Sequence, residues 1–212
     1  MQSQKARNSL PRENMKKVAL SSIKELRFRT DAGVMDCKRA LLETNGDLET
    51  AVDYLRKKGI AKAAEKMGRA TGEGIIEAYI HPGARLGVLL ELRCETDFAA
   101  KTPEFKQLVR DIAMQIAASN PLWVSRENAP EEKVKHEREI YKAQAKEAGK
   151  PDKIWDKIAA GKLEKFYKET CLLEQPFIKN SEITIQELIK EHIAKLKENI
   201  RVNRFARFRI EE

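Results

Sequence analysis

The sequence predicts an α+β protein: a small antiparallel sheet covered by helices, with a projecting helical hairpin and a three-helix module in front. Three observations support this fold class. The spacing of apolar residues changes from a helical to an alternating period near Glu73. Residues 130–148 have a helical pattern with few apolar anchors, which is typical of an arm exposed to water. The last segment, residues 200–210, alternates again and predicts a strand.

Composition limits the function classes that the chain can belong to. Its 212 residues are 42% hydrophobic and 35% charged, which is enough apolar material for a core in a water-soluble protein. No apolar run approaches the ~20 residues that a membrane helix needs. The three cysteines, Cys37, Cys94 and Cys171, are far apart and form no C-x-x-C pair, which favours a reducing compartment.

Charge and turn residues predict the domain organisation. The net charge is +8, and basic residues are concentrated near the N-terminus. We expect residues 1–15 to be a flexible basic leader and residues 16–58 to form the three-helix module. Residues 59–72 read as a linker helix, and residues 73–212 as the α+β core with a helical arm at about 130–161.

Within the first module, turn residues separate three short helices. Thr30 to Gly33 breaks the first helix, Asn45-Gly46 ends the second, and Asp47 can cap the third. Gly59 is expected to stop the third helix.

The core should start with a β-hairpin. Residues 75–80 and 86–94 alternate as strands on either side of a turn at residues 81–84. The inward face of the second strand is expected to consist of Leu86, Val88, Leu90, Leu92 and Cys94.

Helix signals then follow in order. Thr102-Pro103 opens one helix, Gly161 is expected to end the second helix of the arm, and Thr184 with Glu187 forms a capping box. In the last strand we expect one face to carry Ile200, Val202, Ala206, Phe208 and Ile210, with Arg204 as an exception. Arg201, Arg207 and Arg209 would point the other way.

The sequence contains none of the motifs that are typical of an enzyme active site. His81, His136 and His192 have no second ligand at metal-binding spacing. No nucleophile motif is present, and the glycines at 68–74 lack the Gly-Lys-Ser/Thr ending of a phosphate-binding loop. We therefore expect no enzyme activity, no cofactor, no metal and no nucleotide bound by the chain itself.

One segment indicates a binding function. The run C-E-T-D-F-A-A-K, residues 94–101, joins a strand to a helix and places Phe98 beside Asp97. An exposed aromatic residue at such a corner can anchor a partner. The alternative is a phenylalanine that folds back onto its own core.

Several motifs in a fixed order resemble one family. They are K-E-L-R-F-R-T-D-A-G-V-M-D-C-K-R-A-L (24–41), the 94–101 corner, I-A-M-Q-I-A-A-S-N-P (112–121), G-K-P (149–151) and L-L-E-Q-P-F-I-K (172–179). Together they resemble the translation elongation factor Ts (EF-Ts) family in its short form, from about residue 16 to the last strand. The resemblance implies a guanine-nucleotide exchange factor for the GTPase EF-Tu, with a ubiquitin-associated (UBA)-like N-terminal module.

The resemblance also implies which residues contact EF-Tu. Thr96, Asp97 and Phe98 would enter the GTPase domain near its Mg²⁺ and phosphate site, so that GDP leaves. Ala99, Lys101 and Gln115 would add contacts from the core, and Arg27, Val34 and Met35 would contact another helix of the GTPase domain. Two departures from the family stand out: Gln115 replaces a common histidine, and Ala99 follows Phe98 where valine is usual.

By the same resemblance we expect a homodimer, formed through an exposed sheet face. The lack of a long apolar run argues against contact with membranes, and an aromatic content of only 6% argues against nucleic-acid binding. The expected location is the cytoplasm, or an organellar matrix if the leader is a transit peptide. Two other functions stay open: an adaptor that binds a helical or ubiquitin-like partner, and a ribosome-associated or RNA-associated protein that uses the basic N-terminus and the last strand.

Overall fold

A three-stranded antiparallel sheet organises the larger part of the protein, with strand order β1-β2-β5. The computed structural model describes residues 18–30 and 32–210, without the side chains of 60, 62 and 64. The chain divides into two compact units, residues 1–59 and 60–212. The expected leader, residues 1–15, lies outside the described residues.

The first unit contains three helices, as the turn residues predict. They are α1 (Leu20–Thr30), α2 (Val34–Glu43) and α3, which begins at Leu48. Their core consists of Ile23, Leu26, Cys37, Ala40, Leu41 and Ala51. Asp47 Oδ1 accepts a hydrogen bond from the Thr50 N–H at 2.6 Å at the start of α3, so it acts as the expected cap.

The prediction that Gly59 stops the third helix is wrong. Helix α3 continues through Gly59 to Lys66, and the boundary between the two units falls within it. Gly59 does not have a positive φ, so it forms no left-handed cap. A single glycine inside a helix costs only about 1 kcal/mol, which neighbouring good helix formers offset.

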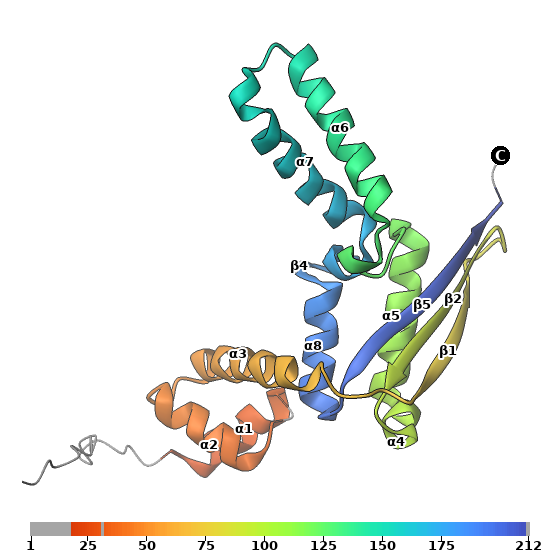
Figure 1. The fold of residues 1–212 in the computed structure, drawn as a ribbon. Helices are drawn as coiled ribbons and strands as arrows, with labels where there is room; N and C mark the ends of the chain where they lie inside the picture. Colours follow the sequence, from red (N-terminus) through yellow and green to blue (C-terminus); the bar gives the residue numbers. More distant parts are fainter. Residues whose placement is uncertain (1–17, 31, 211–212) are drawn as a thin grey trace, which may run out of the picture. The chain divides into compact units, whose positions relative to one another are not determined.

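The sheet of the second unit is formed by β1 (Glu73–Ile80), β2 (Leu86–Cys94) and β5 (Ile200–Arg209). The inner face of β2 is as expected: Val88, Leu90, Leu92 and Cys94 are buried and Leu86 packs against them. Helix α5 (Pro103–Ser119) covers this face together with α8 (Ile185–Leu196) (Figure 1).

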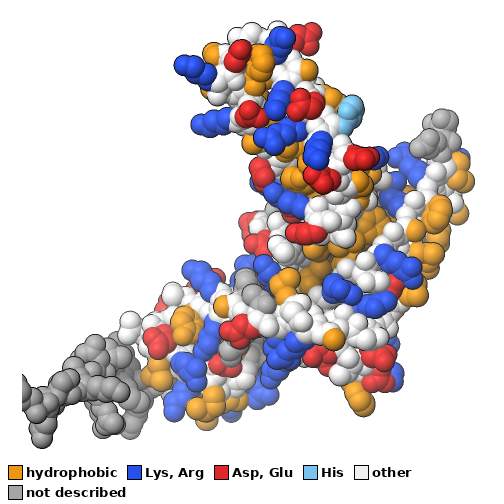
Figure 2. Space-filling view, viewed as in Figure 1, with side chains coloured by type: hydrophobic (Ala, Val, Ile, Leu, Met, Phe, Trp, Pro, Cys, Tyr) orange, Lys and Arg blue, Asp and Glu red, His pale blue; other side chains and the backbone are white. Residues whose placement is uncertain are grey.

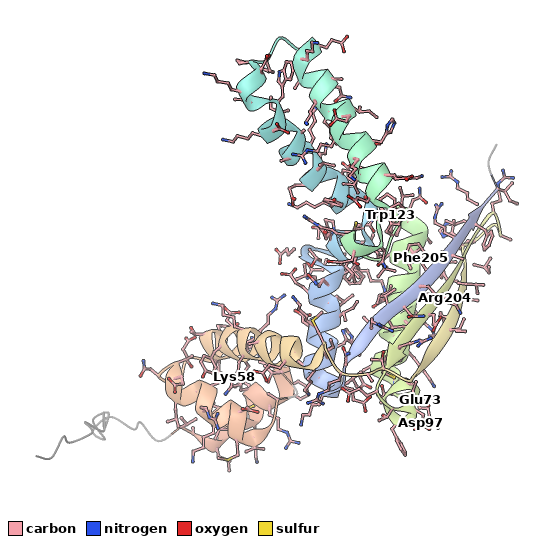
Figure 3. All side chains as sticks on the ribbon, viewed as in Figure 1. Lys58, Glu73, Asp97, Trp123, Arg204 and Phe205 are labelled. Carbon is pink, nitrogen blue, oxygen red and sulfur yellow. The ribbon has the colours of Figure 1, made fainter. Side chains whose placement is uncertain are left out.

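The predicted face of the last strand is wrong beyond Val202. Leu92 pairs with Val202 and Glu91 with Arg204, so Asn203 is an extra residue that forms a β-bulge. After the bulge the alternation is reversed. Phe205 packs against the core, whereas Phe208 is exposed on the outer face. Figure 3 labels Arg204 and Phe205, the two residues of β5 that directly follow the bulge.

Side-chain caps start both covering helices, as predicted. Thr102 Oγ1 accepts a hydrogen bond from the Phe105 N–H, and Pro103 occupies the first turn of α5. Thr184 and Glu187 form a complete capping box at the start of α8. A small hairpin, β3 (Pro176–Phe177) with β4 (Asn180–Thr184), precedes α8.

The arm is a pair of antiparallel helices, α6 (Glu131–Glu147) and α7 (Trp155–Thr170), which Figure 1 shows projecting from the sheet and its covering helices. Single 3₁₀ turns lie at Arg126–Asn128, Asp152–Ile154 and Leu172–Glu174. The prediction that Gly161 ends a helix is wrong, because α7 passes through it without a positive φ.

Candidate partner-binding site

Phe98 lies at the corner where β2 gives way to the short helix α4 (Asp97–Lys101), and it is 80% exposed. Thr96 starts this helix: its backbone is extended and its Oγ1 accepts a hydrogen bond from the Ala99 N–H at 3.3 Å. Ala99 and Ala100 belong to the core. Because they occupy the inner side of the helix, the helical turn directs Phe98 to the solvent.

The corner is closed at its other end by a second threonine. The Thr102 hydroxyl donates to the Ala99 carbonyl at 2.7 Å and accepts from the Phe105 N–H at 3.2 Å. The same side chain therefore ends α4 and starts α5. Two threonine caps fix the backbone on both sides of Phe98, so the ring is carried on a defined support.

An ion pair flanks the exposed ring. Lys101 Nζ donates to Asp97 Oδ2 at 2.6 Å, one helical turn away. This hydrogen bond lowers the pKa of the Asp97 carboxyl and raises the pKa of the Lys101 ammonium. Figure 3 places Asp97 at the end of the sheet where Glu73 begins β1. The corner therefore presents an aromatic ring beside a carboxylate that is ionised at neutral pH.

Four of the sequence-predicted residues, Thr96, Asp97, Phe98 and Lys101, come together at this corner. Ala99 does not belong with them as a contact residue. It is only 6% exposed and packs in the core beneath the corner. The expectation that Ala99 touches a partner is corrected to a supporting role.

Gln115 is also corrected. Its side chain is 0% exposed, so it offers a partner no surface in this structure. Gln115 Oε1 accepts from the Ile178 N–H at 2.9 Å, and Nε2 donates to the Pro176 carbonyl at 3.1 Å and to Gln175 Oε1 at 3.2 Å. The amide thus ties the β3 segment to α5. A polar residue on the inner phase of a helix was the sequence signal for such a buried role.

In the first unit, Arg27, Val34 and Met35 are all exposed, near the end of α1 and the start of α2. Sequence reasoning missed a fourth residue, Phe28, which is 88% exposed on α1. Its position was readable from the helix period, because Ile23 and Leu26 define the buried side. These four residues, here termed the N-terminal patch, combine apolar surface with positive charge.

The outer face of the sheet carries a second apolar surface. It consists of Ile76, Ile80, Leu89, Phe208 and Ile210, all exposed. The register aligns Ile80, Gly87 and Phe208 across the three strands. A shallow depression lies there, lined in part by Leu86, Leu89 and Phe208. Figure 2 shows hydrophobic side chains gathered over this part of the surface. We call these five residues the outer sheet patch.

The three cysteines are buried and free, and burial raises the pKa of the Cys94 thiol to about 11. They are core residues, as Cys94 was expected to be. Among the residues that the structure describes, no group of histidine, cysteine and acidic side chains could hold a metal ion. Within those same ranges no helix is long and apolar enough to cross a membrane.

Comparison with known proteins gives one consistent result. The family model described as "Elongation factor TS" matches residues 13–212, nearly the whole chain. A similar protein, the elongation factor Ts of Carboxydothermus hydrogenoformans, is 60% identical over 190 residues, which cover 90% of this chain and 88% of the relative.

Two further relatives agree. The elongation factor Ts of Syntrophomonas wolfei is 58% identical over 195 residues, covering 92% of this chain and 91% of the relative. That of Moorella thermoacetica is 57% identical over 195 residues, covering 92% and 96%. The range matched by the family model, residues 13–212, includes the segments that form both the corner and the N-terminal patch.

Proposed function

The chain belongs to the elongation factor Ts family of translation elongation factors, and from this premise we propose that it releases GDP from EF-Tu through the Asp97–Phe98 corner. The corner would enter the GTPase near its Mg²⁺ and phosphate site. Displacement of the groups that hold the metal and the phosphates would then weaken GDP binding. The chain would act as an exchange factor and not as an enzyme.

The observation that carries this proposal is the exposure of Phe98 on a support capped on both sides. The Phe98 ring is 80% exposed, and contact between such a large apolar group and water is unfavourable. Burial of the ring by a partner removes this unfavourable contact and so contributes favourable binding free energy. Because the backbone around it is already fixed, little conformational entropy remains to be lost on binding.

One ring does not supply enough free energy. Fully burying a phenylalanine gives roughly 1.5–3 kcal/mol. Lowering the affinity of EF-Tu for GDP about a thousandfold needs about 4 kcal/mol of coupling between the nucleotide site and the site that binds this protein. Further contacts must therefore hold the strained complex. We assign this role to the N-terminal patch of Arg27, Phe28, Val34 and Met35.

Coupling between two binding sites is reciprocal. If this protein weakens GDP binding by some factor, bound GDP weakens the binding of this protein by the same factor. Exchange therefore needs no nucleotide hydrolysis by the factor: the factor binds, GDP leaves, and a new nucleotide displaces the factor. This is consistent with the missing phosphate-binding loop in the sequence.

The test is the release of a fluorescent GDP analogue from EF-Tu, with and without the protein. We expect strong acceleration by the wild type and at least a tenfold loss with Phe98→Ala, about 1.4 kcal/mol or more. Leu122→Ala is the matched control, because Leu122 is an exposed apolar residue of the second unit outside both patches. Normal exchange by Phe98→Ala would exclude the corner as the working part.

The same experiment separates the alternative functions. An adaptor would bind its partner without changing the rate of GDP release. An RNA-associated protein would bind RNA with an affinity that falls steeply with salt concentration. Since the similar proteins named above are bacterial elongation factors, we propose the cytoplasm as the place of action.

We also propose that the protein is a homodimer joined through the outer sheet patch. Five exposed apolar side chains on one sheet face are unusual for a surface that remains in water. A second copy offers the same face, and two such faces would form a sandwich with a shared apolar interior. The proposal rests on the outer sheet patch.

A further inference from the structure

The corner that carries Phe98 is held by a residue far away in the sequence. Thr96 donates two hydrogen bonds to the Glu198 carboxylate: its N–H to Oε2 at 3.0 Å and its hydroxyl to Oε1 at 2.6 Å. Glu198 lies in the turn between α8 and β5. Each carboxylate oxygen therefore accepts one of the two donors of the residue that caps α4.

This contact also orients the cap. A threonine hydroxyl has one proton, and once that proton is given to Glu198 only lone pairs remain for other partners. The Ala99 N–H donates to that same oxygen at 3.3 Å. Glu198 therefore fixes the hydroxyl in the orientation in which it can start the helix of Phe98.

The turn that carries Glu198 is itself firmly placed. Asn199 is buried, and its N–H donates to Glu95 Oε1 at 2.6 Å. Its side-chain Nδ2 donates to the Met67 carbonyl at 3.1 Å and to the Arg69 carbonyl at 2.6 Å. The turn is thus anchored to the end of β2 and to the segment after α3, so Glu198 has a fixed base.

We propose that Glu198 is a positioning residue for the Phe98 corner. This rests on the function proposed above. When Phe98 inserts into a partner, the partner exerts an opposing force on the helix that carries the ring. Helix α4 has only five residues, so its own hydrogen bonds are too few to hold it in place. Two hydrogen bonds to a charged acceptor supply that resistance. Glu198 acts through Phe98 and needs no contact with the partner.

A double-mutant cycle on GDP release tests this, using the full chain and EF-Tu loaded with fluorescent GDP. We expect Glu198→Ala to lower the maximal release rate at saturating factor about tenfold, as expected for two charge-assisted hydrogen bonds. In a Phe98→Ala background the same substitution should lower it less than about twofold, because there is no ring left to position.

The chain offers a matched control for stability. Glu187 accepts the same two kinds of hydrogen bond, from the Thr184 N–H at 2.8 Å and the Thr184 hydroxyl at 3.1 Å, at the start of α8. Glu187→Ala removes an equivalent capping contact away from the corner. We expect it to lower the melting temperature but to leave the maximal release rate within about twofold of the wild type.

Three results would overturn the proposal: a normal rate with Glu198→Ala, an equal loss with and without Phe98, or an equal loss with Glu187→Ala. If Glu198→Ala does not fold, Glu198→Gln enters the same cycle. It keeps the side-chain volume and one acceptor, so we expect about a threefold loss, and no loss would contradict us. If Phe98→Ala itself exchanges normally, the proposed function fails first.

Discussion

Asp97 and Lys101 form an ion pair across one turn of α4, with 2.6 Å between Lys101 Nζ and Asp97 Oδ2, directly beside the exposed Phe98. Both side chains are substantially exposed, so the pair adds little to the stability of the fold. Its position at the corner suggests that the carboxylate serves the partner. This distinction between stability and function is testable.

We expect Asp97→Asn to slow GDP release from EF-Tu and to leave the melting temperature nearly unchanged. Asparagine keeps the shape of the side chain but has no negative charge. In the wild type, the hydrogen bond from Lys101 lowers the pKa of the Asp97 carboxyl and so keeps it ionised. The depressed pKa of Asp97 means that its charge is lost only in acid, so release should not vary with pH between about 6 and 8.

Glu131→Gln is the control for Asp97→Asn, because Glu131 and Lys135 form a similar exposed pair in the arm at 2.7 Å. This control should affect neither release nor melting. Equal exchange by Asp97→Asn and Glu131→Gln would remove Asp97 from the site.

The N-terminal patch should determine affinity and not the maximal rate. Val34→Ala combined with Met35→Ala removes exposed apolar groups, so the fold should stay stable. We expect the factor concentration for half-maximal GDP release to rise about tenfold, while the rate at saturation stays the same. Phe28→Ala should act in the same direction.

Asp53→Ala, at an exposed position of α3, is the control for the patch and should change neither quantity. Should the double substitution instead lower the rate at saturation and leave the half-maximal concentration alone, the patch would belong to the release step.

The ion cluster on the outer sheet face predicts a specific pH dependence of stability. Glu91 accepts hydrogen bonds from Arg93 and Arg204, and these arginines with Asn203 lower its pKa to about 2. The folded pKa lies below the ordinary value near 4.5. The stabilisation is therefore present above about pH 4.5 and is lost as the pH falls toward 2.

The measurement is thermal unfolding of the wild type and Glu91→Gln between about pH 6 and pH 2. We expect the wild type to melt higher near neutral pH, and the difference to shrink steadily in acid as Glu91 is protonated. A difference that does not change with pH would show that the charge of Glu91 contributes nothing.

The proposed homodimer has an expected particle mass, and a single substitution in the outer sheet patch should prevent its formation. Light scattering should give about twice the 24.2 kDa of the chain. Phe208→Glu places a charge in the middle of the proposed apolar contact, so we expect a monomer. Leu122→Glu adds the same charge to an exposed residue elsewhere and should leave the dimer intact. A wild-type particle of 24 kDa would exclude the dimer.

Local chemistry in the sequence was sufficient for much of this protein. The caps at Thr102 and Thr184, the buried alternation of Val88 to Cys94 and the turn before β2 were all predicted correctly. Each depends on residues within a few positions of one another, so short-range hydrogen bonds and hydrophobic period decide them.

Weak local signals produced the errors. Gly59 and Gly161 resemble helix ends, but a glycine within a helix has only a modest cost. Neighbouring helix formers offset it in α3, and packing against α6 offsets it in α7. The exposed Phe98 also had two possible orientations in the sequence. Burial of Ala99 and Ala100 against the core decided between them.

The tertiary structure alone decided three features: the bulge at Asn203, the hydrogen-bond partners of the buried Gln115 amide and the contact between Glu198 and Thr96. In each case the partners are separated by 60 residues or more along the chain, as with Thr96 and Glu198, which lie 102 apart. Such pairs form only when strands and helices from distant segments are brought together, and no local pattern encodes that meeting.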